Sequence, residues 1–119
     1  MPGKRTNPDF LNGVPELLVL KLLSRRPMHG YQLVQALRAA TGDTLDFGEG
    51  CIYPILHRLE AGGMLKCHRE MAGGRNRLVY RVTARGERRL SDSISLWRNV
   101  TQAITRALQG TNDVEVQLA

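Results

Sequence analysis

Two arginines beside a pair of glycines are the residues of this chain best suited to binding an anion. Arg75 and Arg77 follow Gly73 and Gly74 directly, with Asn76 between them. A guanidinium group offers several N–H donors to a phosphate, and paired glycines are typical of a tight hairpin turn. The spacing therefore predicts a phosphate contact at the tip of a hairpin. Solvated surface charges are the alternative.

The distribution of charge supports an anionic partner. The chain has 119 residues and a net charge of +6. Residues 51–89 contain nine basic and three acidic residues, an excess of six that equals the charge of the whole chain. A solvated face mixes both signs, whereas one contiguous basic segment is typical of a nucleic-acid contact. Lys66 lies in this segment and is a further candidate for DNA contact.

A second group of candidate residues lies on a predicted helix that precedes the hairpin. Apolar residues at 52, 55, 56 and 59 indicate one buried helical face, ended by the glycines at 62 and 63. Because a proline deeper than the first turn breaks the hydrogen-bond ladder, Pro54 places the helix start near residue 50 or 51. The major groove of DNA admits one helix, whose first residues approach the bases. The outward candidates are Cys51, Tyr53, Pro54, His57 and Arg58.

Other roles remain open for three of these side chains. Tyr53 could be a buried ring, but its place off the apolar stripe favours DNA contact. Arg58 is as well suited to a salt bridge with a nearby acid as to a phosphate. For His57 the two roles, DNA contact and a solvated surface position, are evenly balanced.

The cysteines and histidines do not form a metal-binding pattern. Neither short Cys-x₂-Cys nor His-x₃-His spacing occurs, so no zinc site is predicted. The chain also has no phosphate-cradling loop, nucleophile motif or paired carboxylates on one helical face, so neither an enzyme nor a cofactor is predicted. One hypothesis is kept for Cys51: a helix N-terminus lowers the pKa of a thiol, which would allow oxidation there to block DNA contact.

The remaining pattern predicts a mainly α-helical fold with a small β-hairpin. A nearly all-apolar helix over residues 14–24 forms the centre, and a second helix begins at Gly30 and ends near Thr41. Residues 43–50 are predicted to be a loop. Residues 65–68 and 78–82 alternate with period two around the glycine turn. This order is that of a winged helix-turn-helix.

A long last helix, capped by Thr83, is predicted over residues 84–108. Apolar residues spaced by four and three form a heptad seam with one polar gap, which predicts a homodimer. Trp97 lies on this seam, and a large aromatic side chain there suits packing in the dimer interface. The seam consists of Leu90, Ile94, Trp97, Thr101, Ile104 and Leu108.

The domain organisation follows from these elements. We expect a flexible arm over residues 1–12, a winged domain over 13–83, a dimerisation helix over 84–109 and a tail over 110–119. The longest apolar stretch, residues 17–23, is interrupted by Lys21 and is far shorter than the roughly 20 residues of a membrane span. Without a signal peptide, the chain is expected in the cytoplasm, with reduced Cys51 and Cys67.

Several segments together resemble the PadR family of transcriptional regulators. They are residues 27–31 (PMHGY), 49–60 (EGCIYPILHRLE), 73–75 (GGR) and 80–83 (YRVT) with Gly86. The resemblance covers residues 14–108. It implies a dimeric regulator, usually a repressor, of the branch with a single C-terminal helix. Members commonly respond to small aromatic or amphipathic compounds, and a tryptophan placed like Trp97 lines a cavity in relatives that bind drugs.

The resemblance also implies roles for individual residues. Tyr53 matches the tyrosine expected to touch the DNA backbone, His29 and Tyr31 match a helix start beside a phosphate, and Arg75 and Arg77 match the basic wing. Cys51 departs from the pattern, which more often has Ser or Thr there. Because a thiol caps a helix poorly, helix stability or operator preference is expected to differ.

A winged-helix module that binds protein instead of DNA is the rival interpretation. The excess positive charge on the third helix and hairpin argues against it. The two differ in salt dependence, because DNA binding through phosphates weakens steeply with salt and apolar protein docking does not. The favoured interpretation is a homodimer that binds double-stranded DNA at a pseudo-palindromic site, with its third helices one helical turn apart.

Overall fold

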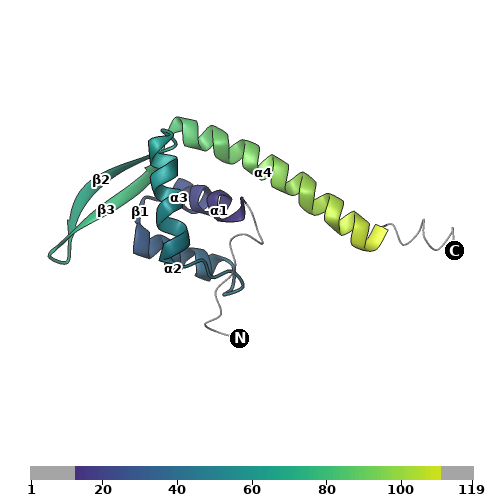
Figure 1. Ribbon diagram of the computed structural model, residues 1–119, viewed down its shortest axis with the longest axis horizontal. Coiled ribbons are helices and arrows are strands. Elements are labelled where there is room, and N and C mark those ends of the chain that lie inside the picture. Colours follow the sequence, from purple (N-terminus) through teal and green to yellow (C-terminus); the bar gives the residue numbers. More distant parts are fainter. Residues whose placement is uncertain (1–12, 111–119) are drawn as a thin grey trace.

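The computed structural model describes residues 13–110 and confirms a mainly helical chain with a small antiparallel sheet and a long last helix (Figure 1). The predicted arm (1–12) and residues 111–119 of the predicted tail lie outside this described part. The elements are α1 (Val14–Arg25), β1 (Met28–His29), α2 (Gly30–Ala40), α3 (Glu49–Ala61), β2 (Leu65–Ala72), β3 (Arg75–Val82), α4 (Ala84–Thr105) and a π-helical turn, η1 (Arg106–Gly110).

The core lies where α1, α2 and α3 meet one face of the sheet. Helix α1 packs against α2, α3, α4 and β3, as expected for a central helix whose apolar residues cover nearly every face. Most of these residues are buried, and Leu17 and Leu18 are partly buried. Phe47, in the predicted loop before α3, is also buried, at 1% exposure, so this loop contributes to the core. The largest fully buried side chains are Val19, Leu20, Leu33, Leu37, Phe47, Ile52, Leu56, Leu59, Leu65 and Tyr80.

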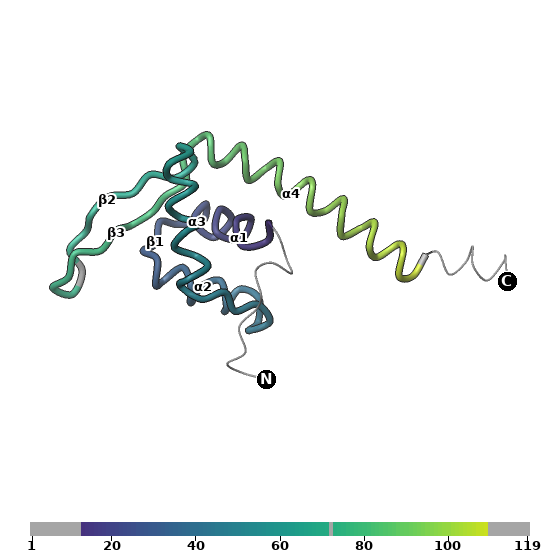
Figure 2. The backbone as a smooth tube through the Cα atoms, viewed as in Figure 1, coloured from purple at the N-terminus to yellow at the C-terminus, as the bar shows by residue number. Residues whose placement is uncertain are grey.

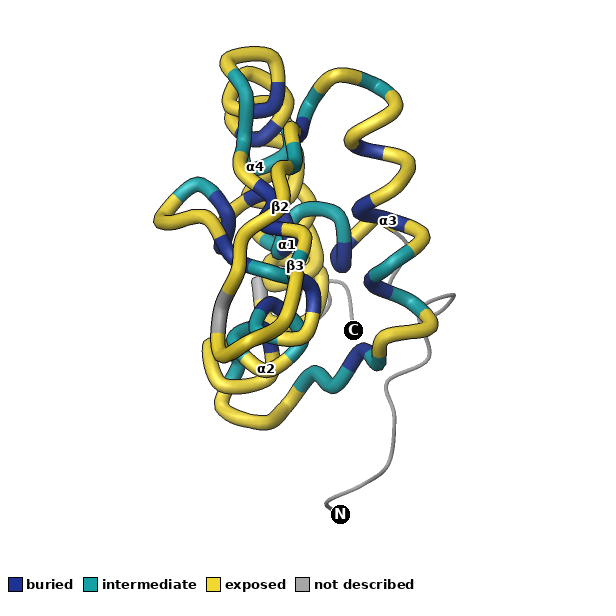
Figure 3. The backbone as a smooth tube through the Cα atoms, turned by 90° about the vertical axis from the view of Figure 1, so that its left-hand side faces the viewer, coloured by how far each residue is buried: buried dark blue, intermediate teal, exposed yellow. Residues whose placement is uncertain are grey.

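Helix α3 begins earlier than predicted. Gly48 is its N-cap and Glu49 its first residue, so Pro54 lies in the second turn instead of the first. The missing N–H of Pro54 leaves the carbonyl of Gly50 without its usual donor. Gly50 and Pro54 are both exposed, so water can serve that carbonyl, and the helix continues to Ala61. Figure 3 shows buried and exposed residues alternating along α3.

The sheet has three strands in the order β1-β3-β2, of which β1 was not predicted. It pairs Met28 with Tyr80 and His29 with Val79. With β1 on one side and β2 on the other, β3 is the central strand, and Val79 and Tyr80 are both buried although they face opposite sides. Leu78 extends beyond β1 and is 41% exposed, so the predicted apolar face of β3 is interrupted there.

The hairpin turn consists of Gly73 and Gly74, whereas the sequence placed Ala72 in the turn as well; Ala72 is the last residue of β2. Their φ angles are 58° and 76°, and positive φ at both central residues is required by the two-residue turn that matches strand twist. Beyond Leu78 the two strands pair only with each other, so the hairpin projects from the domain as a wing. Figure 2 shows the wing and α4 leaving the helical domain in opposite directions.

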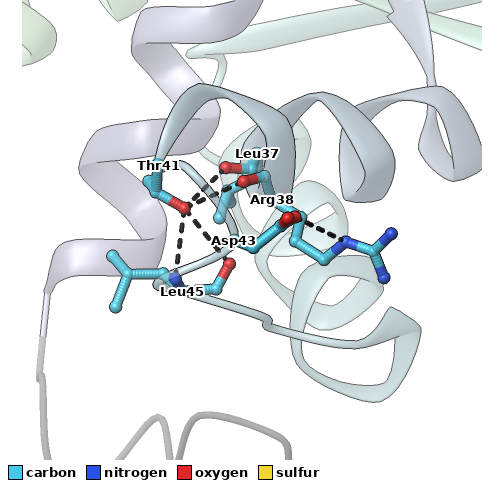
Figure 4. A network of polar contacts seen from close by, with 5 residues as sticks. All are labelled: Leu37, Arg38, Thr41, Asp43 and Leu45. Atoms are coloured by element: carbon cyan, nitrogen blue, oxygen red, sulfur yellow. Dashed lines mark hydrogen bonds and ion pairs between the residues drawn. The ribbon is translucent and has the colours of Figure 1, made fainter. Parts of the chain in front are cut away.

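The end of α2 is held by Thr41, which the sequence placed at the end of this helix. The hydroxyl of Thr41 lies 3.1 Å from the carbonyl oxygen of Leu37 and accepts a hydrogen bond of 3.1 Å from the backbone N–H of Leu45 (Figure 4). The neighbouring pair Arg38–Asp43 adds a contact of 3.3 Å. These contacts fix the loop that carries Phe47 into the core and leads to α3.

Helix α4 is anchored to the turn between α3 and β2. The Thr83 hydroxyl accepts from the N–H of Gly86 at 3.1 Å, which confirms the predicted cap, and donates to the carbonyl of Gly63 at 2.7 Å. The N–H of Thr83 donates to the carbonyl of Met64 at 3.1 Å. The contacts with Gly63 and Met64 therefore fix the start of α4 to the turn that follows α3.

The predicted seam of α4 divides into two halves. Leu90 is only 5% exposed and belongs to the core of its own chain, with Ile94 packed against it. Leu90 therefore has little surface left for a partner, and its place in a dimer interface stays a prediction. From Trp97 onward the helix leaves the domain, and its apolar residues are exposed. Within residues 13–110, no helix is long and apolar enough to cross a membrane.

Candidate nucleic-acid interface

A groove of about 550 Å³ lies between the start of α2, the outer side of α3 and the wing. Its lining includes aromatic, imidazole and guanidinium groups, and none of the described residues that line it carries a carboxylate. Figure 3 views the molecule from this wing side, with α3 beside the hairpin. Seven predicted residues line the groove: His29, Tyr31, Tyr53, His57, Arg75, Asn76 and Arg77.

His29 joins the start of α2 to the wing. It is the N-cap of α2, and its Nδ1 lies 3.3 Å from the backbone N–H of Gln32. Its Nε2 lies 2.7 Å from Nη1 of Arg77 on β3, 48 residues away in the sequence. Burial, and then the positive charge of Arg77, hold the pKa of His29 below its usual range. The imidazole is therefore neutral and positions Arg77 at the groove.

Tyr53 packs directly on the start of α2. A methyl group added at Gly30 would lie 2.5 Å from Cε1 of the Tyr53 ring, so the absence of a side chain at Gly30 makes room for this ring. Burial, and then the charge of Glu49, raise the pKa of Tyr53. Its hydroxyl therefore stays protonated near neutral pH and remains a hydrogen-bond donor.

Tyr31 and His57 complete the helical side of the groove. Tyr31 is 53% exposed, and its hydroxyl accepts a hydrogen bond of 3.1 Å from the Gln35 side chain. His57 is exposed on α3, with its ring centroid 6.4 Å from that of Tyr53. Both side chains can reach a molecule in the groove.

Three groove residues were not singled out from the sequence. Gly30, Leu78 and Tyr80 line the groove in addition to the predicted residues. The ring that packs on Gly30 belongs to Tyr53 on α3, so no neighbouring residue in the sequence indicated this position. Leu78 and Tyr80 carried an alternating apolar pattern that indicated core instead of groove.

Two predicted contact residues lie elsewhere on the surface. Pro54 is exposed on α3 but does not line the groove. Lys66 is exposed on β2 and lines a different depression, together with Glu60 and Arg81. Neither is brought together with the seven groove residues.

Cys51 does not behave as predicted. It is partly buried and packs against the core, and the N-cap of α3 is Gly48, so position 51 neither caps the helix nor faces outward. Burial raises the pKa of the Cys51 thiol, and the positive charge of Arg58 acts in the opposite direction. A raised pKa lowers the thiolate fraction, so this pKa lends no support to redox sensing at Cys51, which stays a hypothesis. Cys51 and Cys67 are both free thiols.

Arg58 forms an ion pair with an acidic residue, which is one of the two roles considered for it from the sequence. Its Nη2 lies 3.4 Å from Oε1 of Glu16 on α1. The other carboxylate oxygen of Glu16 lies 3.0 Å from Nη2 of Arg89 on α4. The Glu16 side chain is only 15% exposed between the two guanidinium groups. Arg58 therefore joins α3 to α1 and α4 instead of facing the groove.

Replacing Glu16 with glutamine is expected to lower the free energy of unfolding by about 1 kcal/mol, because two partly exposed ion pairs are lost. High salt should reduce this difference, since ions screen both pairs. Urea denaturation at low and high salt measures it. The matched control is Asp43→Asn, which removes the exposed pair with Arg38 and should change stability very little. Equal losses in both variants would contradict a special role for Glu16.

Known proteins resemble this chain over most of its length. Residues 19–92 match the transcriptional regulator PadR-like family. A transcriptional regulator of Mycobacterium tuberculosis is 30% identical over 102 residues, which cover 86% of this chain and 89% of the relative. The crystal structure of a PadR family transcriptional regulator from Eggerthella lenta superposes with a TM-score of 0.73 at 30% identity and covers 85% of this chain and 87% of that chain.

A PadR-like transcriptional regulator from Bacillus cereus gives a TM-score of 0.74 at 26% identity, covering 85% of this chain and 97% of that chain. Sequence and fold thus agree over the helices, the wing and the start of α4, and they agree on a role in transcription. The chain therefore belongs to the PadR-like family of transcriptional regulators, and it is a DNA-binding regulator, not an enzyme.

Proposed function

We propose that this chain is a repressor that binds a pseudo-palindromic operator as a homodimer, with one DNA half-site at each groove. The observation that carries the proposal is the carboxylate-free groove between α2, α3 and the wing. DNA presents a row of phosphates, and a concave surface lined by guanidinium and imidazole groups favours such a ligand. A groove that binds a protein would not need to exclude carboxylates from its lining.

The three sides of the groove suit different parts of the duplex. Tyr53 and His57 on α3 face the same space as Arg75 on the wing. A helix in the major groove with a wing on the adjacent backbone would use all three at once. His29 and Tyr31, at the start of α2, add groups beside the positive end of a helix, where a phosphate is favoured.

The dimer is proposed on the outer half of α4. Trp97, Val100 and Ile104 are 37%, 38% and 50% exposed, and Leu96 and Leu108 are 66% and 74% exposed. Spacings of three and four residues place most of them on one side of the helix. A continuous apolar side on a helix that projects from its domain needs a partner, and a second copy supplies the same side in return.

An effector would bind where the two copies of α4 meet. Trp97 is the only tryptophan, and it lies at the point where α4 leaves the core. An indole there can stack on a planar aromatic compound as readily as on a partner side chain. A ligand that changed the angle between the two helices would change the separation of the two grooves and release the operator.

Replacing Arg75 with glutamine is expected to weaken binding to DNA broadly, whatever its sequence, because Arg75 is proposed to contact a phosphate. The affinity of the wild type should fall about 1,000-fold or more between about 50 and 200 mM salt. The logarithmic salt slope of the variant should be smaller by about 1. Fluorescence anisotropy with a labelled operator duplex, and with an unrelated duplex, measures both quantities.

Arg106→Gln is the matched control, because it removes the same charge at the start of η1, far from the groove along the chain. It should leave the salt slope unchanged. A wild-type affinity that does not depend on salt would contradict DNA binding through phosphates. An Arg75→Gln variant that changes only base preference would contradict a backbone contact.

A further inference from the structure

His29 occupies a position in which both ring nitrogens face a hydrogen-bond donor. Nδ1 faces the backbone N–H of Gln32 at 3.3 Å, and Nε2 faces the Arg77 guanidinium at 2.7 Å. A guanidinium group only donates, and a neutral imidazole has a single lone pair available to accept. A neutral His29 ring can therefore accept a hydrogen bond from Gln32 or from Arg77, but not from both. Both donors are satisfied only when another group accepts from one of them.

A phosphate is the group that would complete it. Arg77 donates through several N–H groups and binds phosphate more strongly than it binds a neutral nitrogen. Once a phosphate oxygen accepts from Arg77, Nε2 of His29 is free to carry a proton and donate to the same anion. Nδ1 of the neutral ring can then accept from Gln32. A second proton on the ring adds a full positive charge beside the phosphate, at the cost of the 3.3 Å contact.

We propose that His29 and Arg77 form a phosphate-responsive pair that takes up a proton from solvent when the DNA backbone enters the groove. The inference rests on the proposed function, because it assumes that this groove receives DNA. In the free protein the charged ring is opposed by burial and by Arg77, which together lower the pKa of His29. In the complex, the negative phosphate favours the charged ring and raises that pKa.

The residues that line the groove around His29 do not supply a negative charge in the absence of DNA. The wing contributes Arg75 and Arg77, α2 contributes Tyr31, and α3 contributes Tyr53 and His57. Tyr80 completes the titratable groups of the groove, and burial raises its pKa.

Two carboxylates lie close to the groove residues without lining it. Glu49 acts on Tyr53, and Glu70, opposite Arg77 in the sheet, is paired with His68 at 2.8 Å. The pKa of His29 is lowered by burial and by Arg77 in spite of both acids. The anion that would stabilise the charged imidazole is therefore an external one.

The pH dependence follows from the two states of the ring. Above the pKa of His29 in the complex, the ring is neutral in both states and the affinity for DNA does not depend on pH. As pH falls through that pKa, the complex binds a proton that the free protein does not, so the affinity rises. The rise ends below the pKa of the free protein. Because each occupied groove takes up one proton, the affinity for DNA can rise by at most about tenfold per pH unit for each groove.

The test measures affinity for a mixed-sequence duplex by fluorescence anisotropy between about pH 5 and pH 8, at constant ionic strength. The full chain is compared as wild type, His29→Asn and His68→Gln. Asparagine is a good N-cap, so it preserves the contact with Gln32 but cannot titrate. His68 is an exposed histidine on β2 that does not line the groove, so its replacement controls for the loss of one imidazole. We expect the rise in affinity at low pH in the wild type and in His68→Gln, and its loss in His29→Asn.

A pH dependence that persists in His29→Asn, or that disappears in His68→Gln, would overturn the inference. Absence of DNA binding by the wild type at every pH would instead contradict the proposed function. A second measurement needs no variant. Nitrogen NMR of the His29 ring should show an Nε2 without a proton in the free protein, and a pKa that rises when the duplex is added. An unchanged pKa would also overturn the inference.

Discussion

Replacing Gly86 with alanine is expected to lower the free energy of unfolding by about 3 kcal/mol or more. A methyl group at this position would lie 2.2 Å from the carbonyl oxygen of Met64 and 2.7 Å from Cγ1 of Val82. The first contact is with backbone, which cannot rotate away as a side chain can. The start of α4 would have to separate from the α3–β2 turn, and the contacts of Thr83 with that turn would be strained. Urea denaturation followed by circular dichroism measures the loss.

Gly50→Ala is the matched control, since it adds the same methyl group to another helix. Nothing lies within 4 Å of a methyl group at Gly50, and its φ is not positive. Alanine is the better helix former, so this variant should be stabilised by up to about 1 kcal/mol. If Gly86→Ala were as stable as Gly50→Ala, the close approach of α4 to Met64 would not exist in solution.

Replacing Ile104 with aspartate is expected to convert the proposed dimer into monomers. The side chain is 50% exposed in the single chain, so the domain should fold normally. In a dimer, each carboxylate would be buried without a partner, at a cost on the order of several kcal/mol, and each dimer carries the change twice. A monomer holds one half-site only, so operator affinity should fall about 100-fold to 10,000-fold. Sedimentation equilibrium and anisotropy measure the two effects.

Gln102→Asp controls for the added charge and for the low helix propensity of aspartate. Gln102 is exposed on α4 but away from its apolar side. This variant should remain dimeric and bind the operator like the wild type. A wild-type protein that is already monomeric, or an Ile104→Asp variant that stays dimeric, would contradict the proposed interface. Circular dichroism confirms that both variants remain folded.

Elements held together by local rules were predictable from the sequence. The apolar spacing in α1, α2 and α3 gave their locations, and the glycine pair gave the turn of the wing, because these patterns depend on residues a few positions apart. Strand β1 could not be found in this way. It has two residues, too few to show a period, and it exists because β3 offers an open edge beside it.

The candidate site was predictable in its residue types but not in its pairings. The arginines of the wing and the aromatic residues of α2 and α3 were identified singly. The contact between Arg77 and His29 joins residues 48 positions apart, and that between Arg58 and Glu16 joins residues 42 apart. Such pairings depend on how helices pack, which a local pattern does not encode. Leu90 shows the same limit, since its heptad position suited either its own core or a partner.

The anchor at Thr83 has a geometric consequence for the proposed dimer. It fixes the direction in which α4 leaves the domain, and the 22 residues of the helix extend about 33 Å from there. Each residue of a helix turns its faces by about 100°, so one residue inserted between Ile94 and Trp97 would rotate the outer apolar side by that angle around the axis. The partner, and with it the second groove, would be carried around the DNA. In the proposed dimer, the number of residues between the anchor and the outer apolar side would therefore set how the two half-sites are placed on the DNA.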